Sequence, residues 1–174
     1  MSTPVIETER LTLRPPGPQD EAAIVTYYMS ERARFTGGNV PKFQAWKNFA
    51  AMLGHWQVRG FGLWAVTAKN SDTALGLVGP FFPETWPEHE LGWLVFEDAE
   101  GRGIAHEAAV AARTHAYSVL GWTTAVSYIR DGNDRSVALA QRLGCQRDSG
   151  APLPPHADQA NDHVYRHPAP EELA

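Results

Sequence analysis

The sequence has one cysteine, Cys145, in 174 residues. A single thiol excludes an internal disulfide and a zinc site built mainly from cysteine. No motif places a histidine or carboxylate to activate this thiol, so we interpret Cys145 as a small buried apolar residue rather than a nucleophile. The histidines show no metal-ligand spacing either, and we expect no metal.

Long apolar runs are also missing, because no stretch approaches the roughly 20 residues that cross a bilayer. Residues 1–7 lack the basic and apolar blocks of a signal peptide. We therefore expect a cytoplasmic protein without a membrane partner. The net charge is −5 and the basic residues are scattered, which argues against nucleic acid as a partner because phosphate contacts need a concentrated positive face.

Apolar residues are plentiful, at 43% of the chain. This composition and length suit one domain with a proper core. We predict a single domain over residues 1–167 and a disordered tail over residues 168–174. No internal repeat interrupts this organisation.

The order of elements is mixed α/β. Alternating or continuous apolar residues predict strands at 9–14, 63–66, 74–79, 90–96, 123–129 and 163–166. Helical spacing and caps predict helices at 20–30, after Pro41, at 104–120 and at 136–143. In the second helix, a core-facing stripe is predicted for Phe43, Trp46, Phe49, Leu53 and Trp56.

The segment over residues 97–107 joins a buried strand to a helix. Gly101 and Gly103 permit a tight turn, and the first N–H groups of the helix have no partner inside it. The helix dipole adds about half a positive charge there. These features indicate an anion site at Arg102, Gly103, Ile104, Ala105 and His106. From the residues alone, a plain turn is an equally good reading.

Residues 101–108, Gly-Arg-Gly-Ile-Ala-His-Glu-Ala, resemble the coenzyme A pyrophosphate loop of the GNAT acetyltransferases. The likeness is strongest to the branch that acetylates ribosomal-protein N-termini (RimJ/RimL-like). The family pattern, Gln/Arg-x-x-Gly-x-Gly/Ala, is matched by Gly103 and Ala105, and Glu100 at its first position is a departure. Three further stretches resemble this branch in the same order: 8–14 followed by Asp20, 90–95, and 133–145.

This resemblance implies the GNAT fold, a central, mostly antiparallel twisted sheet that is splayed at the middle and flanked by helices. It also implies transfer of an acetyl group from acetyl-CoA to an amine by direct attack in a ternary complex. The amine partner is a small molecule or a protein N-terminus. Oligomeric state is left open, a homodimer included. The alternative is an acyl-CoA-binding module of the same fold that acts as a sensor or scaffold without turnover.

The resemblance also assigns cofactor contacts. Backbone contacts to the pantetheine arm are expected from three strand residues, Trp93, Leu94 and Val95. Asn133 resembles the residue that hydrogen-bonds this arm, with a helix N-cap as its alternative. Ser136 occupies the position of the acid that protonates the departing thiolate, with a locally capping serine as its alternative. The tyrosine that many family members use for this step is replaced by Ala140.

Glu90 is the candidate general base. An attacking amine must be neutral, yet amines have ordinary pKa values near 8 to 10.4, so some group must accept a proton. Glu90 begins the strand expected to hold the cofactor and can accept this proton directly or through a water. The alternative is a strand-edge carboxylate that pairs with a nearby base. The residues leave both readings open.

Overall fold

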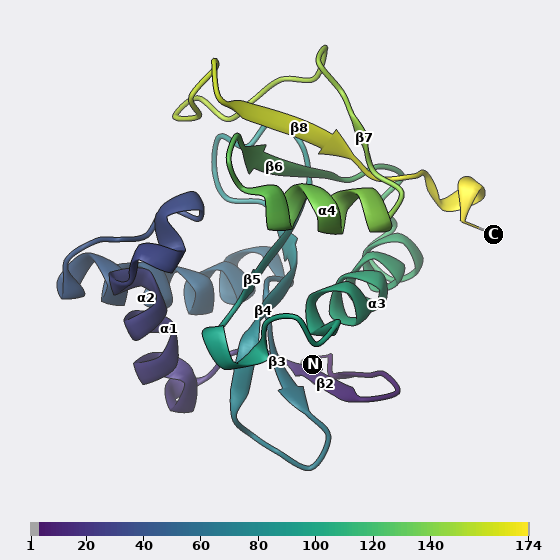
Figure 1. Cartoon of the computed structure of the whole chain (residues 1–174). Helices are drawn as coiled ribbons and strands as arrows, with labels where there is room; N and C mark the ends of the chain where they lie inside the picture. Colours follow the sequence, from purple (N-terminus) through teal and green to yellow (C-terminus); the bar gives the residue numbers. More distant parts are fainter. Residues whose placement is uncertain (1–3, 174) are drawn as a thin grey trace.

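The computed structural model describes residues 4–173 and contains an eight-stranded sheet in the order β1-β2-β3-β4-β5-β6-β8-β7 (Figure 1). The strands are β1 (Ile6–Glu7), β2 (Leu11–Arg14), β3 (Trp64–Ala68), β4 (Ala74–Phe81), β5 (Glu90–Val95), β6 (Val126–Arg130), β7 (Gln146–Arg147) and β8 (Asp162–Arg166). The α-helices are α1 (Glu21–Met29), α2 (Lys42–Arg59), α3 (Ile104–Ser118) and α4 (Asp134–Arg142). Short 3₁₀ turns are η1 (Pro18–Asp20), η2 (Glu31–Phe35), η3 (Glu97–Ala99) and η4 (Pro170–Glu172).

Helices cover both faces of the sheet. α1 and α2 lie together on one face, and α3 lies on the other, with α4 below β6 and β8 in the view of Figure 1. Each face has its own apolar core. The core under α1 and α2 is built around Ile24, Phe49 and Leu94. The core under α3 includes Ala108, Ala112 and Ala116, all 0% exposed, and these small residues let the helix approach the sheet closely.

The predicted mixed α/β fold with a mostly antiparallel sheet is confirmed. Neighbouring strands pair antiparallel except β5 and β6, which run parallel. The predicted helices and strands are all present, with ends that differ by a few residues. The two strands that the sequence did not predict, β1 and β7, have two residues each. Such short strands carry no usable periodicity.

The predicted apolar stripe of α2 is partly wrong. Phe43 and Trp46 are 70% and 44% exposed, and their rings stack on each other at 6.3 Å between centroids. The buried face runs instead through Ala45, Phe49, Met52, His55 and Trp56. The helix is therefore turned so that small or polar residues, Ala45 and His55, face the core in place of two large aromatic ones.

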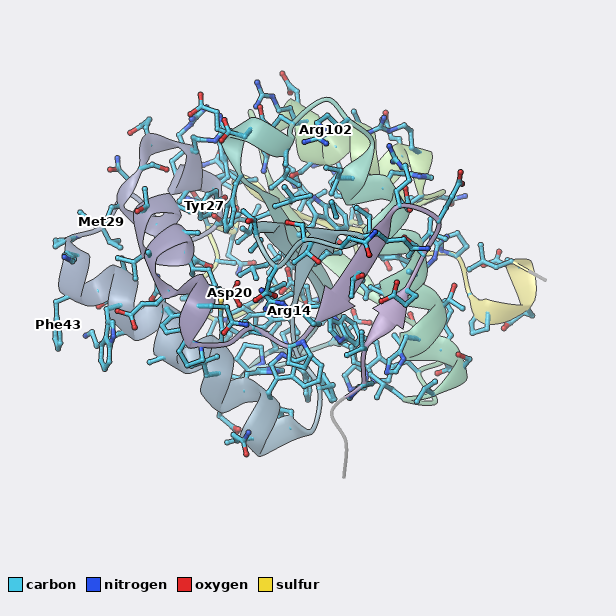
Figure 2. All side chains as sticks on the ribbon, turned by 90° about the horizontal axis from the view of Figure 1, so that it is seen from below. Arg14, Asp20, Tyr27, Met29, Phe43 and Arg102 are labelled. Atoms are coloured by element: carbon cyan, nitrogen blue, oxygen red, sulfur yellow. The ribbon has the colours of Figure 1, made fainter. Side chains whose placement is uncertain are left out.

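A buried ion pair explains the spacing between the opening strand and Asp20. The guanidinium of Arg14 donates to both carboxylate oxygens of Asp20, at 2.7 and 2.8 Å. Asp20, which is 2% exposed, also accepts the Gly17 N–H at 2.8 Å. The two side chains point toward one another where β2 leads into α1 (Figure 2). This pair fixes α1 against the sheet and lies away from the cavity described below.

The chain after residue 167 includes η4, and the Tyr117 hydroxyl donates to the Pro168 carbonyl at 2.9 Å. The predicted domain boundary at 167 stays a prediction.

Cys145 is 7% exposed, and burial raises the pKa of its thiol to about 12, as expected for an inert core residue. Across residues 4–173, no helix combines the length and apolar character needed to cross a membrane.

Candidate functional site

The sheet opens between β5 and β6. The two strands are in register at Glu90 and Val126, where the Val126 N–H donates to the His89 carbonyl at 3.0 Å. One residue further, the Ser127 hydroxyl donates to the Leu91 carbonyl at 2.6 Å. Beyond this point the strands separate, and no further backbone hydrogen bonds join them within residues 4–173. The predicted splay therefore has its closed end at Glu90 and Val126.

The open edge of β5 carries backbone groups of alternate residues. The carbonyls of residues 89 and 91 face β6, whereas the Phe96 N–H donates to Leu75 at the β4 side, at 2.9 Å. Strand alternation therefore turns the backbone groups of Trp93 and Val95 toward the gap and those of Leu94 toward β4. Of the three predicted backbone contacts, two face the gap. Leu94 can contribute only its side chain, which lines the cavity.

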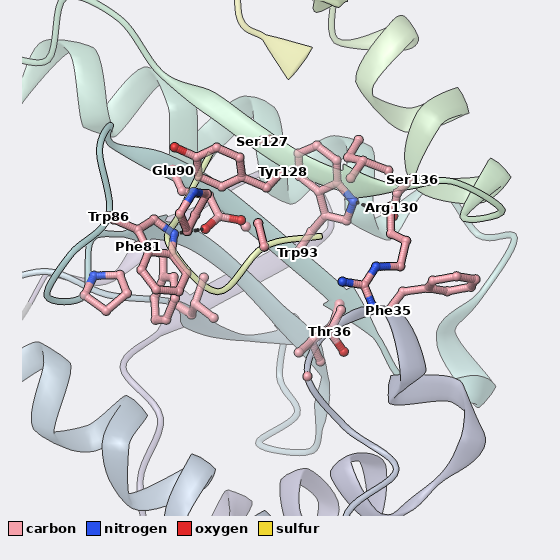
Figure 3. Close-up of a pocket in the computed structure, with 18 of the residues that line it drawn as sticks. Phe35, Thr36, Phe81, Trp86, Glu90, Trp93, Ser127, Tyr128, Arg130 and Ser136 are labelled. Atoms are coloured by element: carbon pink, nitrogen blue, oxygen red, sulfur yellow. Dashed lines mark hydrogen bonds between the residues drawn. The ribbon is translucent and has the colours of Figure 1, made fainter. Parts of the chain in front are cut away.

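A cavity of about 510 Å³ follows this opening. It is lined by residues of β5, β6, the start of α4, the helical pair α1 and α2, and the connection before β8 (Figure 3). Glu90, Trp93, Leu94, Asn133 and Ser136 all line this one cavity. The structure thus brings five of the predicted site residues together, although they come from segments 40 residues apart.

Glu90 lies at the closed end of the opening. Its carboxylate accepts the indole N–H of Trp86 at 2.7 Å, and none of the ion pairs found among residues 4–173 includes it. Burial raises the pKa of Glu90 to about 7, while the hydrogen bond from Trp86 opposes that rise. The alternative of a carboxylate paired with a nearby base does not describe this environment.

The closed end is held by a buried polar network. The Ser127 hydroxyl, which donates to Leu91, lies 3.0 Å from Nε2 of His167, so this nitrogen carries the hydrogen. Nδ1 of His167 lies 3.4 Å from the Arg113 guanidinium. His167 is 3% exposed, and burial, with a smaller effect of Arg113, lowers its pKa to about 3. This neutral histidine joins β6, α3 and the chain end behind the cavity.

The loop before α3 presents a row of free amides. Gly101 and Gly103 have φ of +70° and +73°, left-handed values that favour glycine. The amides of residues 101 and 103–106 donate to no protein acceptor found within residues 4–173, whereas Arg102 closes the turn over residues 100–101. The helix pattern begins with the Glu107 N–H bonded to the Gly103 carbonyl at 3.1 Å. Unpaired amides are present at the start of every α-helix, so the anion site at this loop stays a prediction.

Side chains play a small part at this loop. Ile104 is 4% exposed and packs in the core, and Arg102 points outward with its Nη1 at 3.4 Å from the Asp98 carbonyl. Gly103 and His106 line a second hollow beside Arg10. Arg10 and Glu107 form an ion pair at 2.6 Å, which ties the first turn of α3 to the start of β2. The predicted residues here therefore offer mainly backbone N–H groups.

Glu100, the departure from the family pattern, is neutralised by two arginines. Its carboxylate pairs with Arg32 of η2 and with Arg135 in the first turn of α4. The loop is thereby tied to the helical layer on one side and to α4 on the other. The sequence did not predict these pairs, because the partners lie 35 or more residues away.

Ser136 and Asn133 form a small network with Trp93. The Ser136 hydroxyl oxygen accepts the Trp93 indole N–H at 3.1 Å, which leaves the hydroxyl hydrogen free to donate. Asn133 caps α4, its side-chain oxygen accepting the Ser136 N–H at 3.4 Å. The amide nitrogen of Asn133 keeps its hydrogens for another acceptor. Ala140 is 0% exposed in the core, so its position offers no route for an acid into the cavity.

The sequence indicated two further lining residues without giving them a role: Trp86, within the loop 79–88 expected to frame the acceptor pocket, and Tyr128, a possible donor whose direction the sequence left open. Trp86 lies in the loop before β5, and its contact with Glu90 depends on a turn in which Thr85 has φ +72°, a value that threonine rarely adopts. Tyr128 lines the same cavity, and its hydroxyl is buried without a hydrogen-bond partner among residues 4–173. The proline- and tryptophan-rich composition of the loop 79–88 indicated its place at the pocket, whereas the bond from Trp86 to Glu90 was not predicted.

Similarity to known proteins agrees with this geometry. The family model described as an acetyltransferase (GNAT) domain matches residues 10–146. A crystal structure of an acetyltransferase from Agrobacterium tumefaciens is 38% identical, with 97% of this chain and 96% of that chain covered and a TM-score of 0.89.

Two more distant structures share the fold. A protein described as a GNAT-family acetyltransferase from Bordetella pertussis is 25% identical over 95% of this chain and 99% of that chain, with a TM-score of 0.77. RimL, a ribosomal L7/L12 α-N-protein acetyltransferase solved with coenzyme A, is 17% identical over 94% of this chain and 97% of that chain, with a TM-score of 0.71. The splayed sheet, the glycine loop before α3 and the family match together place this chain in the GNAT acetyltransferase family.

Proposed function

We propose that this protein is an N-acetyltransferase that moves the acetyl group of acetyl-CoA to an amine. The observation that carries the proposal is the group of free amides at residues 103–106, at the loop that leads from β5 into α3. A diphosphate has the charge that such a row of donors binds, and the separated strands provide the adjoining gap that a pantetheine arm needs. GNAT acetyltransferases use this cofactor, which fits the donor set.

The cofactor contacts follow from these donors. The diphosphate would accept hydrogen bonds from the amides of Gly103, Ile104, Ala105 and His106. Arg102 would contribute its guanidinium, because its N–H closes the turn over residues 100–101. The arm would pair with the free backbone groups of Trp93 and Val95, and the side chain of Leu94 would contact it. Asn133 has a free amide nitrogen that can donate to a carbonyl of the arm. Apart from that of Arg102, no protein charge is needed for these contacts.

The chemical step uses Glu90 as base. Glu90 takes one proton from the ammonium, and the neutral amine nitrogen attacks the thioester carbonyl. As the C–S bond breaks, a second proton leaves the nitrogen of the tetrahedral adduct and ends on the departing sulfur, which gives the amide and free coenzyme A. A pKa of about 7 leaves roughly half of Glu90 ionised at neutral pH. An ammonium with a pKa near 10 would transfer its proton uphill by about 4 kcal/mol, and an apolar pocket lowers this cost because desolvation lowers the pKa of the amine as well.

We assign Ser136 to the departure of the coenzyme A thiolate. Its hydroxyl hydrogen is not used by the protein, since Ser136 accepts rather than donates in its bond with Trp93. The amide of Asn133 already caps α4, so capping does not account for the Ser136 hydroxyl. A thiol has an ordinary pKa near 8.5, and its departure needs only modest help. The Ser136 hydroxyl can give that help by donating a hydrogen bond to the sulfur and passing on the proton that leaves the attacking nitrogen.

A binding module without turnover is the second candidate, favoured by the buried alanine in place of a tyrosine at position 140. Two measurements separate the candidates. Calorimetry with acetyl-CoA tests binding, and release of free thiol with a panel of amines tests transfer. The proposal expects binding together with thiol release that depends on an amine. Binding with no release on any class of amine would favour the module, and no binding would refute both.

A further inference from the structure

The part of the cavity around Glu90 is distinct from the gap that the cofactor arm would fill. We name it the acceptor chamber and define it by Met52, Phe81, Trp86, Glu90, Tyr128 and His156, all of which line the cavity. Leu94 packs in the core under α1 and α2, and strand alternation puts Glu90 on that same face. Tyr128 lies on this face too, because its neighbours Ser127 and Ile129 point to the opposite core. Figure 3 shows Phe81, Trp86, Glu90 and Tyr128 grouped together.

The acceptor chamber has one carboxylate to offer. Glu90 is held by the Trp86 indole and has no cationic partner among residues 4–173. The other carboxylate that lines the cavity, Asp162, is occupied by Arg130 in a two-pronged pair at 2.7 and 2.8 Å. One ammonium can therefore be neutralised here. A second buried ammonium would be left unpaired, which is strongly unfavourable.

The walls of the chamber are aromatic rings. Trp86 meets Phe81 edge-on at 5.8 Å and contacts the ring of His156 at 4.7 Å. Phe81 in turn stacks on His55 at 5.1 Å. Rings in this arrangement offer flat apolar faces to a ligand and can attract an ammonium group through their π electrons.

The chain between β7 and β8 closes the chamber on one side. Pro154, His156 and Ala157 of this connection line the cavity, and His156 reaches Trp86 across it. An acceptor longer than one apolar group would have to bring its polar atoms past these side chains. The backbone N–H and C=O groups of a peptide would be desolvated there without partners.

We infer that the acceptor is a primary amine with one positive charge, carried on a flat apolar body such as an aryl ring. This inference rests on the proposed acetyl transfer and specifies its acceptor. The ammonium would lie against Glu90, and the ring would pack against Trp86 and His156. Polyamines, aminoglycosides and peptide N-termini are excluded by their extra charges or by their polar main chain.

The test is a comparison of kcat/KM for 2-phenylethylamine, tryptamine, spermidine and a short peptide with a free N-terminus, at saturating acetyl-CoA. The two aryl amines are expected to exceed spermidine and the peptide by at least about tenfold. If spermidine or the peptide is acetylated as well as the aryl amines or better, the inference is wrong and the proposed transfer stands. If acetyl-CoA binds and none of the amines is acetylated, both the inference and the proposed transfer fall.

A variant locates the preference in the chamber. His156→Ala removes one wall, and the KM for 2-phenylethylamine is expected to rise about threefold to tenfold, with the KM for acetyl-CoA unchanged. Phe43→Ala is the matched control, because Phe43 is an exposed aromatic residue on the outer face of α2 (Figure 2). Equal KM values for the amine in both variants would place the ring elsewhere and overturn the assignment of the chamber.

Discussion

The indole N–H of Trp86 donates to the carboxylate of Glu90 at 2.7 Å. This bond stabilises the ionised form of an acid that burial would otherwise keep protonated. A buried carboxylate with a pKa of about 7 and no ion pair among residues 4–173 has the properties of a general base near neutral pH. The rate of acetyl transfer should therefore depend on pH, and variants of Glu90 and Trp86 should change this dependence in different ways.

Loss of the base should slow transfer. Glu90→Gln is expected to lower kcat about a hundredfold or more, with the Kd for acetyl-CoA unchanged. In the wild type, the rate should rise with pH through about 7, because the carboxylate must be ionised to accept a proton. Trp86→Phe removes the stabilising donor and should move this rise to higher pH. A pH profile of kcat that is unaffected by either change would refute the role of Glu90.

The same shift predicts an effect on stability. The pKa of Glu90 is raised in the folded protein, so the folded state binds more protons than the unfolded state between pH 4.5 and 7. Stability contributed by the protonated acid is lost as the pH rises through this range. Glu90→Gln should therefore raise the melting temperature at pH 8 more than at pH 5. Equal changes at both pH values would contradict this linkage.

The hydroxyl of Ser136 should matter more for catalysis than for folding. Ser136→Ala is expected to lower kcat about tenfold, at the low end for an acid catalyst because a thiolate leaves readily. The melting temperature should fall only slightly, because the variant loses the bond from the Trp93 indole while Asn133 still caps α4 through the Ser136 backbone N–H. Ser118→Ala is the control, since Ser118 bonds only to the Thr114 carbonyl at the end of α3. A fall in stability without a fall in kcat would restore the capping interpretation.

The carboxylate of Glu100 should weaken cofactor binding. Glu100→Gln removes a negative charge beside the glycine loop and frees Arg32 and Arg135 from their pairs. The Kd for acetyl-CoA is expected to fall about threefold, since partly exposed charges act weakly. Glu97→Gln is the control, because that side chain is 79% exposed and lies 3.8 Å from Arg32. A higher Kd in Glu100→Gln would mean that the ties to the loop matter more than the charge.

Buried His167 should make the protein sensitive to acid. Its pKa falls to about 3 on folding, so below pH 6.5 the unfolded state takes up a proton that the folded state refuses. Between pH 6.5 and 5 this linkage should cost about 2 kcal/mol of the free energy of unfolding. Denaturant titrations of His167→Gln should show a smaller loss over this range. The exposed His156, changed to Gln, serves as the control, and equal slopes in all three proteins would contradict the prediction.

Local sequence patterns predicted the helices and strands, whereas the predicted cofactor contacts came from the resemblance to the GNAT family. The strand at β5 was predicted from a nearly continuous apolar run and the helix α3 from its alanine-rich sequence, and the glycine loop lies between these two elements. In α2, by contrast, large aromatic residues at helical spacing suggested a buried face. Packing selected Ala45 and His55 instead, leaving Phe43 and Trp46 outside.

The sequence did not predict side-chain contacts between segments that lie far apart in the chain. The bonds from Trp86 to Glu90 and from Trp93 to Ser136, and the pairs of Glu100, depend on how loops and strands meet in space. The same holds for the alternation of β5, which turns the backbone of Leu94 toward β4 and away from the gap. The apolar residues of the sequence identify β5 as a strand. They do not show which edge of β5 faces the gap left by β6.

The free amides at the start of α3 can be tested one at a time. Ala105→Pro removes one N–H from the first turn of the helix, where proline is tolerated because that donor has no helical partner. Ala22→Pro is the matched control, since Ala22 is likewise the second residue of its helix, α1. Both proteins should remain folded. Calorimetric titration with acetyl-CoA should give a Kd at least about tenfold higher for Ala105→Pro and unchanged for Ala22→Pro, whereas equal affinity in the two variants would contradict the placement of the diphosphate on these amides.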